Sequence, residues 1–271
     1  MGTDVLSVRD LRVYYHTPRG AVRAVDGVTF DIKAGERLGL VGESGSGKTT
    51  IALALMQLIR APGKIEGGEV LVDGTDLLKL NEEQMRQRRL AVIAMVAQGA
   101  MNSLNPVIRV RDQIVDALKD HGLRLSKSEL EARIASLLER VGLQRNVADM
   151  YPHELSGGMK QRVSIARGLV QDPPVLLMDE PFAALDEQTR MTMGHELLRI
   201  WSQTRKTVVF ITHSLTEAVY LADEVLVMSP RPGRIIDRVP VTLPRPRTYE
   251  MMATDTFGKL RERIWQQIRK A

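Results

Sequence analysis

The chain has 271 residues, a net charge of +5 and 44% hydrophobic residues, a composition typical of globular proteins. It contains no cysteine, which excludes disulfide scaffolds, thiolate metal sites and cysteine nucleophiles. No apolar run reaches the roughly 18 residues of a membrane span, and the first residues lack a secretory signal pattern, so we expect a cytosolic chain. The positive charge is compatible with a nucleic acid, an anionic lipid or an anionic ligand.

The first part of the chain predicts short strands joined by turns. Residues 5–15 alternate loosely between apolar and polar, and residues 37–41 form a compact, partly apolar run. A helical pattern follows from Lys48 to about Ile59, and residues 67–74 predict another strand that ends in a turn. We interpret a later basic cluster as a solvated helix face: Arg86, Arg88 and Arg89.

The middle of the chain, about residues 99–171, predicts a helical insert between two strand-rich parts. Ser126 and Glu129 have the spacing of a capping box, and apolar residues recur at helical intervals over residues 130–141. A second helical pattern runs over about residues 158–171 and stops before two prolines.

The last part predicts three buried parallel strands, at residues 175–178, 208–211 and 225–228. Residues 230–247 are rich in Pro and Arg and predict a series of turns. The final segment, about Thr248–Lys270, predicts a helix with a rough apolar stripe: Met252, Phe257, Leu260, Ile264, Trp265 and Ile268. We expect this helix to dock on its own domain or on an associated domain; the alternative is contact with a membrane surface or a membrane partner.

A glycine-rich segment after the strand at 37–41 fits the phosphate-binding spacing G-x-x-x-x-G-K-[ST]: Gly42, Glu43, Ser44, Gly45, Ser46, Gly47, Lys48 and Thr49. Glycines let the backbone wrap around phosphates, and its amides with the following helix N-terminus supply donors. Lys48 would lie near the β- and γ-phosphates, and Thr49 would offer its hydroxyl to Mg²⁺. Thr50, the next residue, is a further candidate for binding the nucleotide. The alternative is a surface turn that matches by chance.

Two carboxylates end the apolar strand at residues 175–178. Ligands of open α/β sheets bind at the carboxyl ends of strands, so Asp179 is suited to hold the shell of Mg²⁺. Glu180 is suited to orient the attacking water or accept its proton. Such a pair alone could be a plain strand end, but after a phosphate-binding loop it predicts the second half of a nucleotide site.

A third motif distinguishes among proteins with such a loop. Leu155-Ser156-Gly157-Gly158-Met159 predicts a helix that begins with a hydroxyl and two glycines, which makes an exposed anion-binding N-terminus. Because this helix start lies outside the phosphate cradle, we infer that the nucleotide is clasped from a second side. An ordinary N-cap at Ser156 is the alternative.

In their order and spacing these motifs resemble the ATP-binding cassette (ABC) ATPases, and the resemblance covers nearly the whole chain. It implies an α/β fold: a P-loop NTPase with a RecA-like core, an antiparallel β subdomain and an inserted α-helical subdomain. The ATPase domain would span residues 5–240, with the helical subdomain at about 99–171. Residues 241–271 would form a C-terminal extension with an amphipathic helix.

The resemblance also implies roles for residues, with ATP and Mg²⁺ as ligands. Two cassettes would pack head to tail, so that Ser156, Gly157 and Gly158 of one cap the ATP held by the other. Asp186, in Ala184-Leu185-Asp186, matches the D-loop at the dimer seam.

Three further residues match positions around the nucleotide. Gln98 matches the Q-loop glutamine that contacts Mg²⁺ and the attacking water, although it could be a solvated loop residue. His213 matches the switch histidine at the γ-phosphate, although a lone histidine is often simply a satisfied polar residue. Tyr15 falls where the family places an aromatic under adenine, although it could simply be a strand residue that packs on the sheet, and Tyr14 is its rival.

Different segments of the chain resemble different branches of the family. Residues 101–106 and 151–159 resemble the ATPases of oligopeptide, dipeptide and nickel importers. Residues 179–186, 212–218 and 229–235 are more similar to the ATPases of nitrate, sulfonate and taurine importers.

The resemblance therefore implies the ATP-hydrolysing subunit of a bacterial importer for peptides or another small solute. Its partners would be an identical or paralogous cassette, two transmembrane permease subunits and, indirectly, an extracytoplasmic substrate-binding protein. The chain would lie peripherally on the cytoplasmic face of the inner membrane. Alternatives are a nucleic-acid-linked ABC ATPase and an exporter-type ABC ATPase, although we expect no nucleic-acid partner because the chain has no long coiled coil and no zinc-ligand set.

Overall fold

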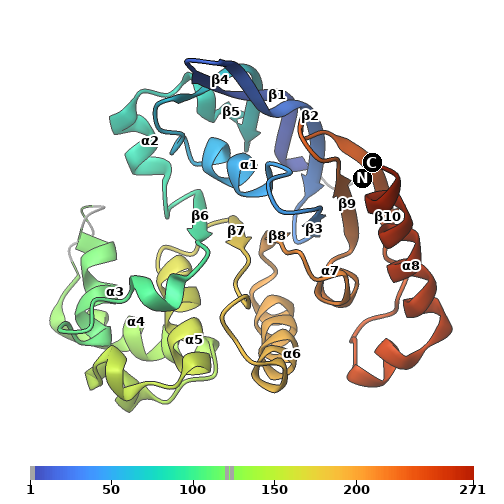
Figure 1. The fold of residues 1–271 in the computed structure, drawn as a ribbon. Coiled ribbons are helices and arrows are strands. Elements are labelled where there is room, and N and C mark those ends of the chain that lie inside the picture. Colours follow the sequence, from blue (N-terminus) through green and yellow to red (C-terminus); the bar gives the residue numbers. More distant parts are fainter. Residues whose placement is uncertain (1–3, 120–121, 123–124) are drawn as a thin grey trace.

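The computed structural model describes residues 4–119, 122 and 125–271 and contains two sheets (Figure 1). One is a four-stranded antiparallel sheet with the order β2-β1-β4-β5, and the other is a six-stranded sheet with the order β10-β9-β3-β8-β7-β6. The strands are β1 (Asp4–Thr17), β2 (Gly20–Lys33), β3 (Arg37–Val41), β4 (Gly63–Val72), β5 (Thr75–Asp76), β6 (Ile93–Val96), β7 (Val175–Asp179), β8 (Thr207–Ile211), β9 (Glu224–Met228) and β10 (Ile235–Pro240). The three buried parallel strands that the sequence predicts are therefore confirmed.

The antiparallel sheet explains why the first residues alternate only loosely. Asp10 has a φ of 45°, and the pairing of β1 with both neighbours shifts register around it. Such a bulge changes which side chains face the core, so Val8 and Leu11 are both buried although they are three residues apart. At the far end of β1, Tyr15 pairs with Val22 of β2.

The six-stranded sheet separates two hydrophobic cores. On β7, Val175 and Leu177 belong to one core, while Leu176 and Met178 belong to the other. This alternation follows from the two-residue period of a strand, and burial on both faces explains the continuous apolar runs. The strands β3, β7 and β8 run parallel, so their carboxyl ends lie at the same edge of the sheet.

The helices are divided between the two faces of this sheet. They are α1 (Lys48–Leu55), α2 (Glu82–Arg88), α3 (Val110–Lys119), α4 (Lys127–Arg140), α5 (Gly157–Gly168), α6 (Glu187–Thr204), α7 (Leu215–Leu221) and α8 (Asp255–Lys270). α1 packs with the antiparallel sheet in one core, whereas α3 to α8 contribute to the other. α3, α4 and α5 follow β6 and precede β7, and they form the lower left lobe in Figure 1.

Three sequence-based boundaries differ from the structure. The helix at Lys48 ends at Leu55, earlier than expected, because the chain leaves the helical conformation at Gln57, whose φ is 49°. The last helix starts at Asp255, where Thr254 provides the N-cap, and a 3₁₀ helix occupies residues 249–253. Residues 230–247 include strand β10 and are not only turns.

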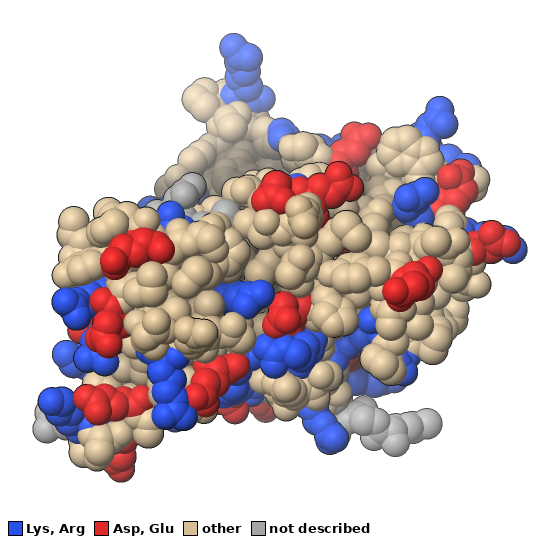
Figure 2. Space-filling view, turned by 90° about the horizontal axis from the view of Figure 1, so that it is seen from below, with Lys and Arg blue, Asp and Glu red and all other residues tan. Residues whose placement is uncertain are grey.

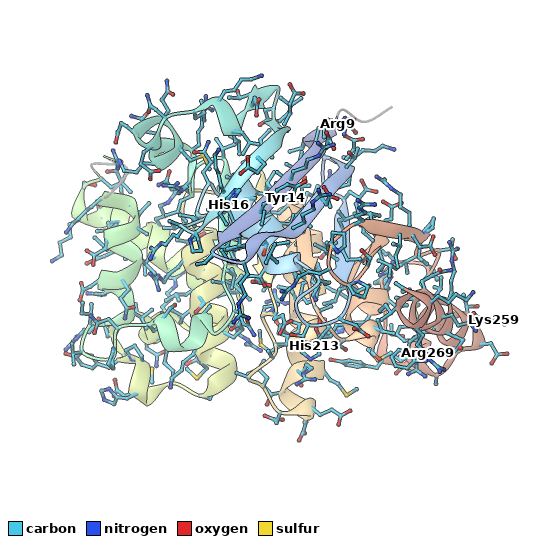
Figure 3. All side chains as sticks on the ribbon, turned by 45° about the horizontal axis from the view of Figure 1, so that its top comes forward. Arg9, Tyr14, His16, His213, Lys259 and Arg269 are labelled. Atoms are coloured by element: carbon cyan, nitrogen blue, oxygen red, sulfur yellow. The ribbon has the colours of Figure 1, made fainter. Side chains whose placement is uncertain are left out.

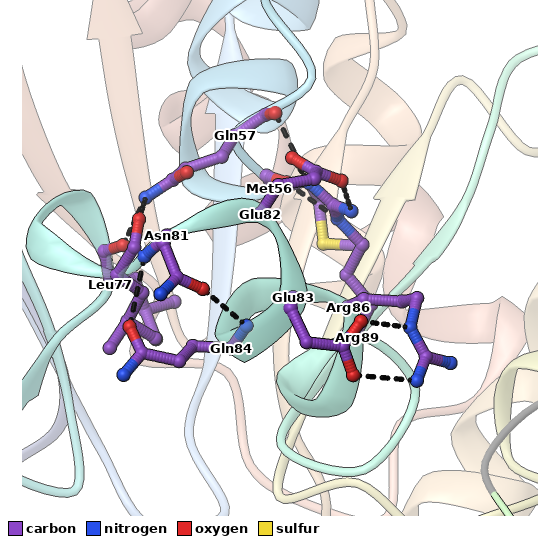
Figure 4. A network of polar contacts seen from close by, with 10 residues as sticks. Met56, Gln57, Leu77, Asn81, Glu82, Glu83, Gln84, Arg86 and Arg89 are labelled. Carbon is purple, nitrogen blue, oxygen red and sulfur yellow. Dashed lines mark hydrogen bonds and ion pairs between the residues drawn. The ribbon is translucent and has the colours of Figure 1, made fainter.

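The basic cluster around α2 is only partly a solvated face (Figure 4). Arg86 is exposed and pairs with Glu83 at 2.8 Å. Arg89, in contrast, is only 17% exposed in its side chain, pairs with Glu82 and donates to the carbonyl of Met56 at 3.0 Å. The expectation is therefore wrong for Arg89, which ties the end of α2 to the end of α1.

Helix α8 docks on its own domain, which is one of the placements that we expect from the sequence. Phe257 and Ile264 are buried in the core shared with α7 and β9, and Arg263 pairs with Asp237 of β10 at 3.0 Å. Trp265 departs from the expected stripe because its ring is turned outward and 48% exposed. Among residues 4–119, 122 and 125–271, no helix combines the length and apolar character of a bilayer span.

Candidate functional site

The glycine-rich loop connects β3 to α1 and curls around the side chain of Lys48. The Nζ atom donates to the carbonyls of Gly42 at 2.8 Å and Glu43 at 2.7 Å, and to the hydroxyl of Ser46 at 3.2 Å. Burial lowers the pKa of Lys48, while the carboxylates of Glu180 and Asp179 act in the opposite direction. The ammonium group is thus held at the loop by groups that an anionic ligand can replace.

Glycine is required at the last turn of this loop. Gly47 has a φ of 93°, and a Cβ atom there would approach the carbonyl oxygen of Ala24 to 2.5 Å. Gly47 is also the N-cap of α1 and provides no side-chain hydrogen bond to the first amides of the helix. These amides are therefore free of side-chain caps and suited to phosphate oxygens.

Asp179 and Thr49 form the candidate magnesium site. The Thr49 hydroxyl donates to Asp179 Oδ1 at 3.2 Å, and Asp179 is 1% exposed. Burial raises the pKa of Asp179, and its Oδ2 atom has no hydrogen-bond partner among the described residues. A hydroxyl beside a buried, incompletely satisfied carboxylate fits Mg²⁺, which binds through one or two protein oxygens together with phosphates and waters.

Glu180 lies at the centre of a polar cluster at the carboxyl ends of the strands. Gln98 Nε2 donates to Glu180 Oε2 at 3.3 Å, and His213 Nδ1 lies 3.2 Å from the same oxygen. Glu180 adopts a φ of 44°, and its amide donates to the carbonyl of Ile211 on β8. The chain thus leaves the extended conformation of β7 at Glu180, through a backbone conformation that is uncommon for a residue other than glycine.

These residues surround one cavity of about 630 Å³. Its lining includes most of the nucleotide-binding and catalytic candidates: Tyr15, Ser44, Gly45, Gly47, Lys48, Thr49, Thr50, Gln98, Glu180 and His213. Gly42, Glu43, Ser46 and Asp179 lie directly behind this lining, as the contacts of Lys48 and Thr49 show.

The structure also separates Tyr15 from Tyr14. Tyr15 lines the cavity, whereas the Tyr14 hydroxyl donates to Asp26 at 2.7 Å and does not line it. Figure 3 shows Tyr14 on β1, with His213 below the antiparallel sheet in that view. Of the two tyrosines, Tyr15 is therefore the one that shares the cavity with the phosphate loop.

Sequence reasoning missed Arg231 as a site residue. Its side chain lines the same cavity, and its Nε atom donates to the carbonyl of Gly45 at 3.4 Å. The signal in the sequence is the stretch at residues 229–235, which resembles one branch of the family. Gly233 of that stretch pairs with Ala24 and brings Arg231 to the loop.

The residues of the third motif, Ser156, Gly157 and Gly158, are called the signature residues here, and α5 is the signature helix. Together with Asp186 they lie elsewhere. Ser156 caps α5 by accepting from the amide of Met159 at 3.3 Å, and Asp186 caps α6 by accepting from Thr189 at 2.9 Å. Ser156, Gly157, Gly158 and Asp186 line a second cavity of about 560 Å³, which shares no lining residue with the first. Ser156 and Gly157 are exposed, so a neighbouring molecule can reach this helix start.

Comparisons with known proteins agree with this geometry. The model of the ABC transporter family matches residues 25–183. The dipeptide transport ATP-binding protein DppD of Caldanaerobacter subterraneus subsp. tengcongensis is 41% identical, over 83% of this chain and 69% of that protein. The oligopeptide transport ATP-binding protein OppD of Escherichia coli is 42% identical, over 83% of this chain and 66% of that protein. The chain spans about two thirds of the length of these relatives.

Solved structures give the same result for the fold. A dimeric bacterial ABC transporter cassette matches with a TM-score of 0.75 and 27% identity, over 88% of this chain and all of that chain. A post-hydrolysis state of the same cassette, bound to ADP and Pi, matches equally well. The phosphate loop, the carboxylate pair and the exposed signature helix thus occur in a fold shared with these ATPases. The chain belongs to the ABC transporter family, as one of its ATP-hydrolysing cassettes.

Proposed function

We propose that this chain is the nucleotide-binding subunit of a bacterial importer and that ATP-driven closure of a cassette dimer powers the transport. The observation that carries the proposal is the single cavity that joins the phosphate loop to Glu180, Gln98 and His213. ATP would occupy this cavity with its base at Tyr15 and its phosphates at the loop.

The carboxylate cluster supports a role in hydrolysis. Glu180 Oε2 is within hydrogen-bonding reach of both Gln98 and His213, so these two residues fix the carboxylate and together frame the position of an attacking water. Mg²⁺ at Thr49 and Asp179 would neutralise the developing phosphate charge when bound. Lys48 would add a further positive charge at the phosphates.

A dimer would complete the site. The signature residues line their own exposed cavity, and within one chain they do not reach the phosphate loop. A second cassette in head-to-tail contact would place Ser156 and Gly158 on the nucleotide. ATP would then favour the closed dimer because it binds both subunits at once, and hydrolysis would remove that preference.

The transported solute would be a peptide or another small molecule. The relatives named for dipeptide and oligopeptide transport are about 40% identical, and the stretches at 101–106 and 151–159 resemble that branch. The coupling partners would be two permease subunits on the cytoplasmic face of the inner membrane, supplied by an extracytoplasmic binding protein. The second cassette would be identical or paralogous.

The distribution of charge gives little support to a nucleic-acid-linked ATPase. Basic and acidic side chains are interspersed on the face shown in Figure 2, so its described residues do not present the continuous basic stripe that would track a phosphate backbone.

ATPase assays on the purified chain test the proposal. We expect hydrolysis that a co-purified permease stimulates and that DNA does not. Glu180→Gln should bind ATP and dimerise in light scattering, yet lose about 10²- to 10³-fold in turnover because it cannot accept a proton. Lys48→Ala is the matched control, since it should instead weaken ATP binding about tenfold or more through a lost charged hydrogen bond.

Near-normal turnover in Glu180→Gln would remove Glu180 from its catalytic role. Unchanged ATP affinity in Lys48→Ala would contradict the assignment of the phosphate cradle. Stimulation by DNA and not by the permease would favour the alternative class.

A further inference from the structure

The carboxyl end of α7 is closed by two arginines from the segment after β10. The last four carbonyls of a helix have no partner within the helix. Arg247 Nη1 donates to three carbonyls in this turn: those of Val219 (3.1 Å), Tyr220 (2.9 Å) and Ala222 (2.6 Å). Arg245 donates to the remaining carbonyl, that of Leu221, at 3.2 Å. The C-terminal segment therefore supplies the whole cap.

Arg247 is buried to an unusual degree for an arginine. It is 3% exposed, and the Tyr220 hydroxyl donates back to its carbonyl at 3.4 Å. Burial, together with repulsion from Arg245, lowers the pKa of Arg247 to about 10, so it is still charged at neutral pH. A buried charge needs oriented dipoles around it, and the negative end of α7 provides them.

The other end of α7 carries the catalytic cluster. His213 immediately precedes the N-cap Ser214, whose side chain accepts from the amide of Glu217 at 3.3 Å. The Glu217 carboxylate accepts from Thr212 at 2.6 Å and lies 3.6 Å from Arg190 of α6. His213 in turn lies 3.2 Å from Glu180. His213 is thus fixed through a helix of seven residues, too short to hold its own position without anchors at both ends.

We propose that Arg247 is a positioning residue for ATP hydrolysis, which holds the carboxyl end of α7 so that His213 stays against Glu180. The inference rests on the proposed function, because it requires His213 to take part in hydrolysis. It gives the C-terminal extension a direct connection to the catalytic cluster, and it places no atom of Arg247 on the nucleotide.

Kinetics of Arg247→Ala separate this role from a purely structural one. We expect turnover to fall about 10- to 100-fold, since a small misplacement of a catalytic group has effects of that size. The Kd for a non-hydrolysable ATP analogue, measured by calorimetry, should stay within twofold because Lys48 and the phosphate loop are untouched. Arg263→Ala is the matched control: it anchors the same extension through Asp237 and should keep normal turnover.

A double-mutant cycle identifies the route of the effect. If Arg247 acts through His213, then Arg247→Ala should lower turnover less than twofold in a His213→Ala background. An equal loss in both backgrounds, or normal turnover in Arg247→Ala, would overturn the inference. Normal turnover in His213→Ala would instead refute the role of His213 in the proposed function, and the inference with it.

Arg247→Met extends the cycle if the alanine variant does not fold. All three carbonyls are reached by the single atom Nη1, and methionine keeps an unbranched side chain but has no donor for them. It should lower turnover as alanine does, and the loss should again be absent in the His213→Ala background. A methionine variant with wild-type turnover would contradict the proposal.

Discussion

Asp179 shows how the demands of a site oppose stability at a single residue. Its carboxylate is buried at the end of β7, and one of its oxygens has no hydrogen-bond partner among the described residues. Because burial raises the pKa of Asp179, the charged form is disfavoured in the folded protein. Thr49 offsets this only in part, with one hydrogen bond at 3.2 Å. A cation at this position would remove the remaining penalty.

Asp179→Asn should therefore stabilise the chain in the absence of nucleotide while abolishing Mg²⁺-dependent hydrolysis. The amide oxygen can still accept from Thr49, and no charge remains buried. We expect a gain of about 1 kcal/mol, or roughly 2–4 °C in melting temperature, at neutral pH. Because the folded pKa of Asp179 is raised, the wild type loses stability as pH rises through that pKa, and the gain should shrink as pH falls below it.

Thermal scans without nucleotide check this prediction, with Asp186→Asn as the control of opposite sign. Asp186 is exposed, and the hydrogen bonds from Thr189 lower its pKa, so its charge favours the folded state. A lower melting temperature for Asp179→Asn than for the wild type would contradict the interpretation of Asp179 as a buried, incompletely paired carboxylate.

At the scale of elements, the sequence predicts those strands, helices and loops whose formation depends on a local residue pattern. The strands β7, β8 and β9 are continuous apolar runs because both faces of the sheet are covered, and the phosphate loop follows from its spacing. The sequence indicates α2 only as a helix face around Arg86, because its start depends on the Asn81 cap and its end on the Arg89 contacts, and β10 lies hidden in a Pro- and Arg-rich stretch. These elements depend on partners distant in sequence.

Helix α8 provides a test of docking at this scale. Ile264 is fully buried against the core, whereas its neighbour Trp265 is 48% exposed, and Lys259 and Arg269 project from the outer side of the helix (Figure 3). Ile264→Ala should lower the free energy of unfolding by about 3 kcal/mol, as expected for a buried isoleucine. Lys259→Ala, at an exposed position of the same helix, should change it by less than about 0.5 kcal/mol.

Urea denaturation measures both values. Equal effects of the two substitutions would mean that α8 does not dock in solution as described. The ATP affinity of both variants should match the wild type, because neither residue lines the nucleotide cavity.

At the scale of the molecule, the sequence predicts both halves of the site and expects the helix start at Ser156 to lie outside the phosphate cradle. In the structure, Ser156 lines a cavity different from the one that Lys48 lines. The motifs do not predict the contribution of Arg231, because it depends on the contact between Gly233 and Ala24. Such contacts join segments about 200 residues apart, and no local pattern encodes them.

The absence of cysteine makes the proposed dimer directly testable. We expect Ser44→Cys in one copy and Ser156→Cys in another, each combined with Glu180→Gln, to form a mixed disulfide on oxidation when Mg²⁺ and ATP are present. Ser44 lies in the phosphate loop, and both serines are exposed, so head-to-tail contact would bring them together. Non-reducing electrophoresis of the mixed variants reports the product.

Ser128→Cys on α4 is the matched control, since it is also exposed but lines neither of the two cavities. It should not cross-link to Ser44→Cys.

Cross-linking of Ser44→Cys with Ser156→Cys that does not depend on ATP would show association without a nucleotide-driven closure. No cross-link at all, in a Glu180→Gln protein that binds ATP, would leave the signature helix without its nucleotide and would contradict an ATP sandwiched between two identical copies. Because a paralogous cassette would give the same negative result between identical copies, the experiment is repeated with the co-purified cassette as the second subunit, and failure there would overturn the head-to-tail arrangement itself.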